Sequence, residues 1–316
     1  MSFSVEVKDE LSAQISSGRH CRIAEIAAII SMCGRVQISA SDKYMLKIHT
    51  ENVAVARKYH NLLKKTFGIT PDVSVRQNTY YTVLIKCHED AEKIFKATKL
   101  IDQFGEIGEN MSLKDNIIIM NECCKRAFIR GAFLATGSIS DPEKFYHCEI
   151  VCSDPQKSTQ LCKIIQNFGI DAKVVERKRH YVVYIKDGSG IVDLLNVMEA
   201  HVALMNFENV RIMKEMRNSV NRKVNCETAN LNKTVSAAVK QIEDIKYIRD
   251  TVGFSYLSEA LEAMAIVRLE NPEASLKELG DLLTPAVGKS GVNHRLRKIC
   301  EIAEDLRNNK EDSYGN

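Results

Sequence analysis

A short segment near the C-terminus concentrates side chains that bind phosphates and nucleic-acid bases. Between Leu282 and Cys300 there is no acidic residue. The basic side chains there, joined by His294 when it is protonated, are Lys289, Arg295, Arg297 and Lys298. Ser290 and Asn293 stand among them, and such hydroxyl and amide groups contact phosphates or base edges. This one-sided charge predicts contact with DNA. The alternative is the solvated basic face of an ordinary helical bundle.

The ten cysteines are a second set of side chains that could do chemistry. Cys123 and Cys124 are adjacent, and Cys148 and Cys152 are four apart in a segment predicted to be a strand. Zinc sites usually combine two short-spaced ligand pairs, and no Cys-x-x-Cys pair is present. The mixed, acidic N-terminus MSFSVEVKDEL is not a secretory signal, which favours reduced thiols. We therefore expect packing cysteines, with no metal site, cofactor or catalytic residue.

The amino-acid composition is typical of a globular protein without a membrane span. The chain has 316 residues, of which 45% are apolar and 27% are charged. These values are typical of two or three globular domains. The net charge is only +3, so a surface for nucleic acid must arise from local clustering. No apolar run of about 18 residues is present, so no membrane span is expected.

An internal repeat supplies the elements of the first two thirds of the chain. RIAEIAAIISMCG, ending at Gly34, matches KRAFIRGAFLATG, ending at Gly137. Further matches follow in the same order at an offset near one hundred residues, among them Phe67-Gly68-Ile69 with Phe168-Gly169-Ile170. Each unit is predicted to be helix, strands, helix, strand, helix. The pair therefore predicts an α+β domain in which each sheet lies on one side of its helices.

Local signals place several elements of this repeat. Residues 43–50 and 80–86 alternate in hydrophobicity, which predicts half-buried strands. The span Val53 to Phe67 has helical spacing, and Gly68 is a natural stop after it. Asp154 and Pro155 are a good helix start in the second unit.

The last third is predicted to be all helical. Helices are expected over 233–251 and 257–269. Ser275 with Glu278 forms a capping box, so a helix starts there. Ser290 is expected to cap a second helix that runs through Leu306. Gly280 sits where the helices of a helix-turn-helix need clearance, and the second helix carries the basic residues to the major groove.

Two polar segments allow more than one interpretation. Residues 218–232 are rich in asparagine, and we predict a linker there that either stays plain or docks on DNA or on the first domain. Residues 177–179, Arg-Lys-Arg, are a further basic cluster at a strand end. They form either a surface turn or an additional DNA contact.

The helix–glycine–strand repeat resembles the LAGLIDADG homing endonuclease fold. In that family two motif helices pack along small residues, and the eighth motif position of each carries an acid for the metal site. Laid on this motif, the two copies are 26–34 and 129–137. The eighth positions are Cys33 and Thr136. The sixth positions, often acidic in the family, are Ser31 and Leu134.

This departure from the motif decides the expected chemistry. Phosphodiester cleavage with two metals needs carboxylates to hold hard cations through oxygen. A thiol and a hydroxyl are poor substitutes. Glu25 and Glu122 lie on the wrong side of their motifs, and Asp141 alone has no partner. We therefore expect a lost nuclease site. A nuclease with an atypical metal site, dependent on Asp141 or Glu122, is the rival hypothesis.

The whole chain resembles the WhiA family of DNA-binding regulators of Gram-positive bacteria. The most specific segments are NRKVNCETANLNKTV and LKELGDLLTPAVGKSGVNHRLRKI, with RGAFLATGSISDPEKFYHCEI in the second repeat. The resemblance implies a degenerate LAGLIDADG-like domain followed by a helix-turn-helix that is the main contact to double-stranded DNA. Carried over, that contact falls on Ser275 to Leu306, so Ser275 joins the DNA-binding residues.

The resemblance also carries expectations about cellular role and organisation. It implies a non-catalytic, cytoplasmic and nucleoid-associated protein linked to transcription, cell division and chromosome segregation, and to sporulation in filamentous members. Protein partners in transcription or cell division fit these roles. A scaffold tethered to the nucleoid is a third hypothesis, and the oligomeric state stays open. The expected domains are 1–20, 21–217 (repeats at about 21–104 and 121–217), 218–232, 233–310 and 311–316.

Overall fold

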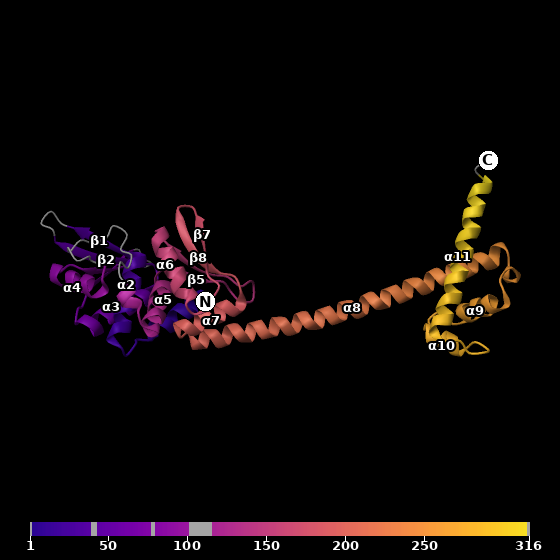
Figure 1. Cartoon of the computed structure of the whole chain (residues 1–316), viewed down its shortest axis with the longest axis horizontal. Coiled ribbons are helices and arrows are strands. Elements are labelled where there is room, and N and C mark those ends of the chain that lie inside the picture. Colours follow the sequence, from indigo (N-terminus) through magenta and orange to yellow (C-terminus); the bar gives the residue numbers. More distant parts are fainter. Residues whose placement is uncertain (1, 39–42, 77–79, 101–115, 315–316) are drawn as a thin grey trace. The chain divides into compact units, whose positions relative to one another are not determined.

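The computed structural model describes residues 2–38, 43–76, 80–100 and 116–314. It divides into two compact units, residues 1–216 and 217–316 (Figure 1). The expected α+β class is confirmed: helices and antiparallel sheets make up the first unit, and helices alone make up the described part of the second.

Both repeats use one order of elements. After α1 (Phe3–Ala13), the first repeat contains α2 (Arg19–Cys33), β1 (Gly34–Ile38), β2 (Tyr44–Thr50), α3 (Val53–Phe67), β3 (Asp72–Arg76), β4 (Tyr80–Ile85) and α4 (His88–Thr98). After the 3-10 turn η1 (Asn116–Ile119), the second contains α5 (Glu122–Thr136), β5 (Gly137–Ile139), β6 (Cys148–Cys152), α6 (Pro155–Gln166), β7 (Lys173–Arg177), β8 (His180–Ile185) and α7 (Gly188–Met198).

The sheets have the same topology, with strand orders β1-β2-β4-β3 and β5-β6-β8-β7, all antiparallel. The predicted unit lacked one strand, because β3 and β7 were not recognised. Every residue of β3 is exposed and β7 is nearly so. An edge strand without a buried face shows no alternation of apolar residues, and that alternation was the signal used.

The helices α2 and α5 form the centre of the first unit. Their buried side chains belong to one continuous core with the inner faces of both sheets. They are close at Gly131, where an added Cβ would lie 2.6 Å from Glu25 O and 2.9 Å from Ala28 Cβ. Gly131 therefore lets the two backbones approach, as expected for a glycine in a paired helix. The helix ends also agree with prediction: α3 ends at Gly68 with φ +74°, and Asp154 caps α6.

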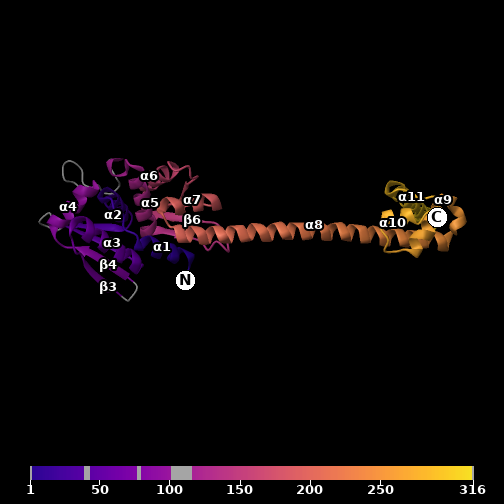
Figure 2. The same ribbon diagram turned by 90° about the horizontal axis from the view of Figure 1, so that it is seen from below.

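The second unit contains the remaining helices. The helix α8 (His201–Thr251) begins in the first unit and continues into the second. After the 3-10 turn η2 (Phe254–Tyr256) come α9 (Glu259–Glu270), α10 (Leu276–Asp281) and α11 (Lys289–Tyr314). Both views show α9, α10 and α11 gathered around the C-terminal end of α8 (Figures 1 and 2).

The expected linker at 218–232 is helical and belongs to α8, so the helix predicted to start at 233 has no separate beginning. No glycine or proline occurs between Gly190 and Gly253, so nothing in the sequence breaks the helix. The segment resembled a linker because residues 217–237 are all exposed, and an exposed helix needs no apolar stripe.

Candidate nucleic-acid interface

The helix pair α10–α11 has the local chemistry of a helix-turn-helix. Ser275 caps α10: its backbone N–H donates to Glu278 Oε2 at 2.7 Å, and its hydroxyl accepts from Glu278 N at 3.4 Å. The predicted capping box is therefore present. At Gly280 an added Cβ would lie 2.1 Å from Val287 O, which is incompatible with any side chain. This glycine lets the turn fold back on α10.

One face of α11 anchors it to the second unit. Val292, Leu296, Ile299 and Ala303 are buried at a spacing of three and four residues, in a core shared with α8, α9 and α10. This spacing places them on one side of the helix. The opposite side of α11 must therefore face solvent.

The exposed side of α11 carries most of the predicted DNA-binding residues. The exposed ones are Lys289, Ser290, Asn293, His294, Arg297 and Lys298. We call these six residues the α11 stripe. Arg297 also lies 3.3 Å from Glu301, both largely exposed, and an exposed pair of this kind holds its arginine only weakly. The stripe is thus available to a ligand.

Two predicted residues are placed differently from the rest, and one predicted cap is wrong. Arg295 is half-buried, on the flank of α11 next to the core. Ser275 is exposed, but its hydroxyl and N–H serve the cap of α10. Ser290 does not cap α11, because the helix already begins at Lys289. Gly288, before it, takes the cap position, where glycine is tolerated.

The eighth positions of the two LAGLIDADG-like motifs, at the C-terminal ends of α2 and α5, hold no carboxylate. Cys33 Sγ donates to Ile29 O at 3.2 Å, and Thr136 Oγ1 donates to Ala132 O at 3.5 Å, so each bonds back to its own helix. Burial raises the pKa of Cys33 to about 12, which keeps the thiol protonated near neutral pH. A protonated thiol is a poor ligand for a hard divalent cation.

Lysines approach this end of the helix pair. Lys157 Nζ donates to Ser31 O at 2.5 Å, and Lys8 Nζ lies 5.9 Å from the Phe133 ring. Both lysines interact electrostatically with Cys33, and burial lowers the pKa of each. Lysine side chains where an endonuclease holds its metals oppose the binding of a divalent cation. The sixth positions, Ser31 and Leu134, are both buried.

The remaining acids near the motifs have other roles. Glu122 lies in the first turn of α5, the opposite end from Thr136, and pairs with Arg126 at 3.1 Å. Asp141 Oδ1 accepts from Glu143 N at 3.0 Å within a turn after β5. Both interactions are structural.

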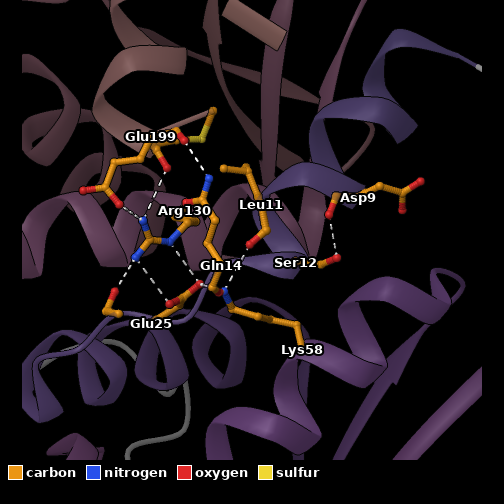
Figure 3. A network of polar contacts seen from close by, with 10 residues as sticks. Asp9, Leu11, Ser12, Gln14, Glu25, Lys58, Arg130 and Glu199 are labelled. Atoms are coloured by element: carbon orange, nitrogen blue, oxygen red, sulfur yellow. Dashed lines mark hydrogen bonds and ion pairs between the residues drawn. The ribbon is translucent and has the colours of Figure 1, made fainter. Parts of the chain in front are cut away.

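Glu25 lies in a buried ionic network (Figure 3). Its Oε1 is 3.1 Å from Lys58 Nζ and 3.2 Å from Arg130 Nε, and all three side chains are almost fully buried. Arg130 Nη1 also contacts Glu199 Oε2 at 2.6 Å. The network joins α2, α3, α5 and the end of α7 with two cations and two anions. Its charges balance, as burial requires.

The basic cluster at 177–179 forms the tip of the β7–β8 hairpin. Arg177 pairs with His180, and the two residues between them, Lys178 and Arg179, have φ of 46° and 69°. Two left-handed residues in a two-residue loop are typical of a type I′ turn. The surface-turn interpretation is therefore correct for its conformation.

The cysteines include a group that sequence reasoning missed. His20, Cys21, Cys123 and Cys124 bring their ligand atoms within 4.8 Å of one another. The signal was present as two adjacent ligand pairs, His-Cys and Cys-Cys, at matching places in the two repeats. It was overlooked because the pairs are 102 positions apart between Cys21 and Cys123 and follow no short-spaced pattern.

Within the described part of the chain, none of the helices combines the length and apolar character needed to cross a lipid bilayer.

Comparison with known proteins covers most of the chain. Three family models match in order: the WhiA N-terminal LAGLIDADG-like domain over residues 19–101, the WhiA LAGLIDADG-like domain over 125–217, and the WhiA C-terminal HTH domain over 220–303. The chain is also similar to the crystal structure of full-length DUF199/WhiA from Thermatoga maritima. That likeness has a TM-score of 0.59 and 25% identity, and it covers 96% of this chain and 99% of that one.

Named relatives agree with the family models. The "Probable cell division protein WhiA" of Lachnoclostridium phytofermentans is 55% identical over 97% of this chain and 100% of its own length. The protein of the same name from Alkaliphilus oremlandii is 49% identical over 98% of this chain and 99% of its own. With two degenerate LAGLIDADG-like repeats followed by a helix-turn-helix domain, the chain belongs to the WhiA family.

Proposed function

We propose that this chain is a non-catalytic regulator that binds double-stranded DNA through α11. The single observation that supports this most is the α11 stripe, which is exposed and free of acids from Lys289 to Lys298 while the opposite face of the helix is buried. A helix held this way can enter the major groove with its N-terminal residues against the bases.

The stripe divides into base-reading and phosphate-binding roles. Asn293 and Arg297 have the side chains that form paired hydrogen bonds, with adenine and guanine respectively. Lys289 and Lys298 are suited to phosphates at the edges of the groove. Each phosphate they neutralise should add about 0.9 to the slope of log affinity against log salt.

The first unit supports a role without cleavage. Cys33 and Thr136 take the metal-binding positions, and Lys8 and Lys157 lie near them. The relatives are named for cell division, which supports a role of this chain in that process. Control of transcription and of chromosome segregation from a nucleoid-associated position, with sporulation in some relatives, fits a sequence-specific DNA-binding protein.

The test begins with genome-wide mapping of binding sites, followed by footprinting of the strongest site. The variant Asn293→Ala with Arg297→Ala should lose about 1–3 kcal/mol of specific binding for each base contact removed. The matched control is Lys246→Ala, an exposed lysine of α8 in the same unit. An unchanged footprint and affinity for the double variant would rule out α11 as the reading helix.

Two further measurements separate the rival functions. Incubation of supercoiled plasmid with Mg²⁺ or Mn²⁺ should yield no cleavage product, and cutting that is lost on Asp141→Ala would establish a nuclease. Expression profiling of a deletion strain should change transcripts beside the bound sites. Many bound sites without such changes would favour a nucleoid-tethered scaffold.

A further inference from the structure

A compact group of soft metal ligands lies where the first turns of α2 and α5 meet. His20 and Cys21 belong to α2, and Cys123 and Cys124 belong to α5. Each repeat thus contributes two adjacent ligands, and all four ligand atoms lie within 4.8 Å of one another. No other group of this kind is found among the described residues.

The distances within this group approach those of a tetrahedral zinc centre. His20 Nδ1 lies 3.1 Å from Cys124 Sγ, 3.3 Å from Cys21 Sγ and 3.9 Å from Cys123 Sγ. Zinc bonds of about 2.3 Å to sulfur and about 2.0 Å to nitrogen place tetrahedral N and S ligands about 3.5 Å apart. The three distances from His20 Nδ1 differ from this value by only tenths of an ångström, and the sulfur atoms, all within 4.8 Å of one another, need to move by at most about 1 Å to receive the ion.

Burial in the hydrophobic core explains the positions of only two of these four residues. Cys21 and Cys124 are buried, as small apolar side chains often are. His20 and Cys123 are exposed, so the hydrophobic effect does not hold them beside the buried pair. The same exposure gives an ion a path from solvent into the group.

The electrostatic setting favours a cation. The four ligand atoms belong to residues in the first turns of α2 and α5, beside the N-terminal ends of both helices. A bound divalent cation deprotonates its thiols, and the positive N-terminal ends of α2 and α5 stabilise the resulting thiolates.

We propose that His20, Cys21, Cys123 and Cys124 form a structural zinc site that joins the first turns of α2 and α5. Four protein ligands leave no open position for water or substrate, which is the arrangement of structural and not catalytic zinc. The site is distinct from the position of the endonuclease metals. Cys33 lies at the other end of α2 from His20. At a rise of about 1.5 Å per residue, the two are separated by about 20 Å along the helix.

A zinc ion bound at this site would link the two repeats, because each repeat supplies two of its ligands. The ends of α2 and α5 that carry the ligands precede the Glu25–Arg130 ion pair by about one helical turn and a half. Zinc would hold the α2–α5 pair at one end, next to the buried network and the close approach at Gly131. Removal of the ion should therefore loosen this pair before the rest of the unit.

The test uses the full chain, purified under reducing conditions without chelator. Elemental analysis should find about one zinc per chain, and Cys123→Ser with Cys124→Ser should lower this to about a tenth. The matched control is Cys87→Ser with Cys226→Ser, two exposed cysteines outside the group, which should keep full occupancy. Circular dichroism of each variant verifies that the fold is retained.

A cobalt experiment on the unaltered chain makes the test independent of folding in the variants. After zinc removal, Co²⁺ should produce the intense visible bands of a tetrahedral ion and the ultraviolet charge transfer of bound thiolates. Occupancy should fall as pH falls, because protons compete for the ligands. A folded chain with all thiols reduced that binds neither ion would overturn the proposal. A disulfide between cysteines of the group in the isolated protein would also overturn it.

Discussion

Replacing Glu25 with glutamine tests the buried ionic network most directly (Figure 3). Glu25→Gln keeps the shape of the side chain and removes one of two anions that balance Lys58 and Arg130. After the change, Arg130 retains Glu199, and Lys58 retains only the carbonyl oxygens of Leu11 and Gln14. One carboxylate, that of Glu199, is then left for two buried cations, and it contacts only Arg130.

The expected cost follows from this count of charges. Removal of one partner from a buried ion pair costs about 3–5 kcal/mol, because the remaining charge is left without compensation. The contacts that survive favour the lower end, about 3 kcal/mol, which corresponds to more than about a 100-fold rise in the opening equilibrium. The effect should be centred on α2, α3 and α5, whose side chains form the network.

Hydrogen exchange measured by mass spectrometry resolves this effect by segment. Peptides from α2 and α5 should lose protection in Glu25→Gln, while those from α9 and α11 should not change. The control is Glu92→Gln, which breaks an exposed pair with Lys96 and should leave the exchange of α2 and α5 unchanged, because solvent screens such a pair. If both variants open α2 and α5 to the same extent, the network does not stabilise the first unit in the way argued.

Two further predictions concern glycines at close approaches. Gly131→Ala should destabilise the first unit by about 1–2 kcal/mol in chemical denaturation, because overpacking outweighs the gain of up to about 1 kcal/mol in helix propensity. The added methyl group would lie 2.6 Å from the backbone oxygen of Glu25, and a more stable variant would contradict this. Gly280→Ala should abolish specific DNA binding, because its Cβ would meet Val287 O at 2.1 Å and displace the turn before α11. The control is Gly288→Ser, because this glycine has open space around it and serine is favoured at the cap position before α11. Equal binding by the two variants would refute the clash.

The sequence predicted several helix ends and caps correctly where all the residues involved belong to one element. The span of α3, its stop at Gly68, the Asp154 cap and the Ser275–Glu278 box depend on residues within a few positions of one another. The repeat was readable because a duplicated fold keeps its apolar pattern and its glycines. The acid-free run of α11 likewise predicted a nucleic-acid contact, because all of its charges belong to one short stretch of sequence.

Other features needed the tertiary structure, because their partners are far apart in the chain. Only the tertiary structure shows that Arg295 is half-buried while Arg297 is exposed, and that residues 218–232 continue a helix. The ion pair of Glu25 with Arg130 joins positions 105 residues apart. The group of His20, Cys21, Cys123 and Cys124 forms for the same reason: two packed helices bring their first turns together, and no spacing within either repeat encodes that meeting.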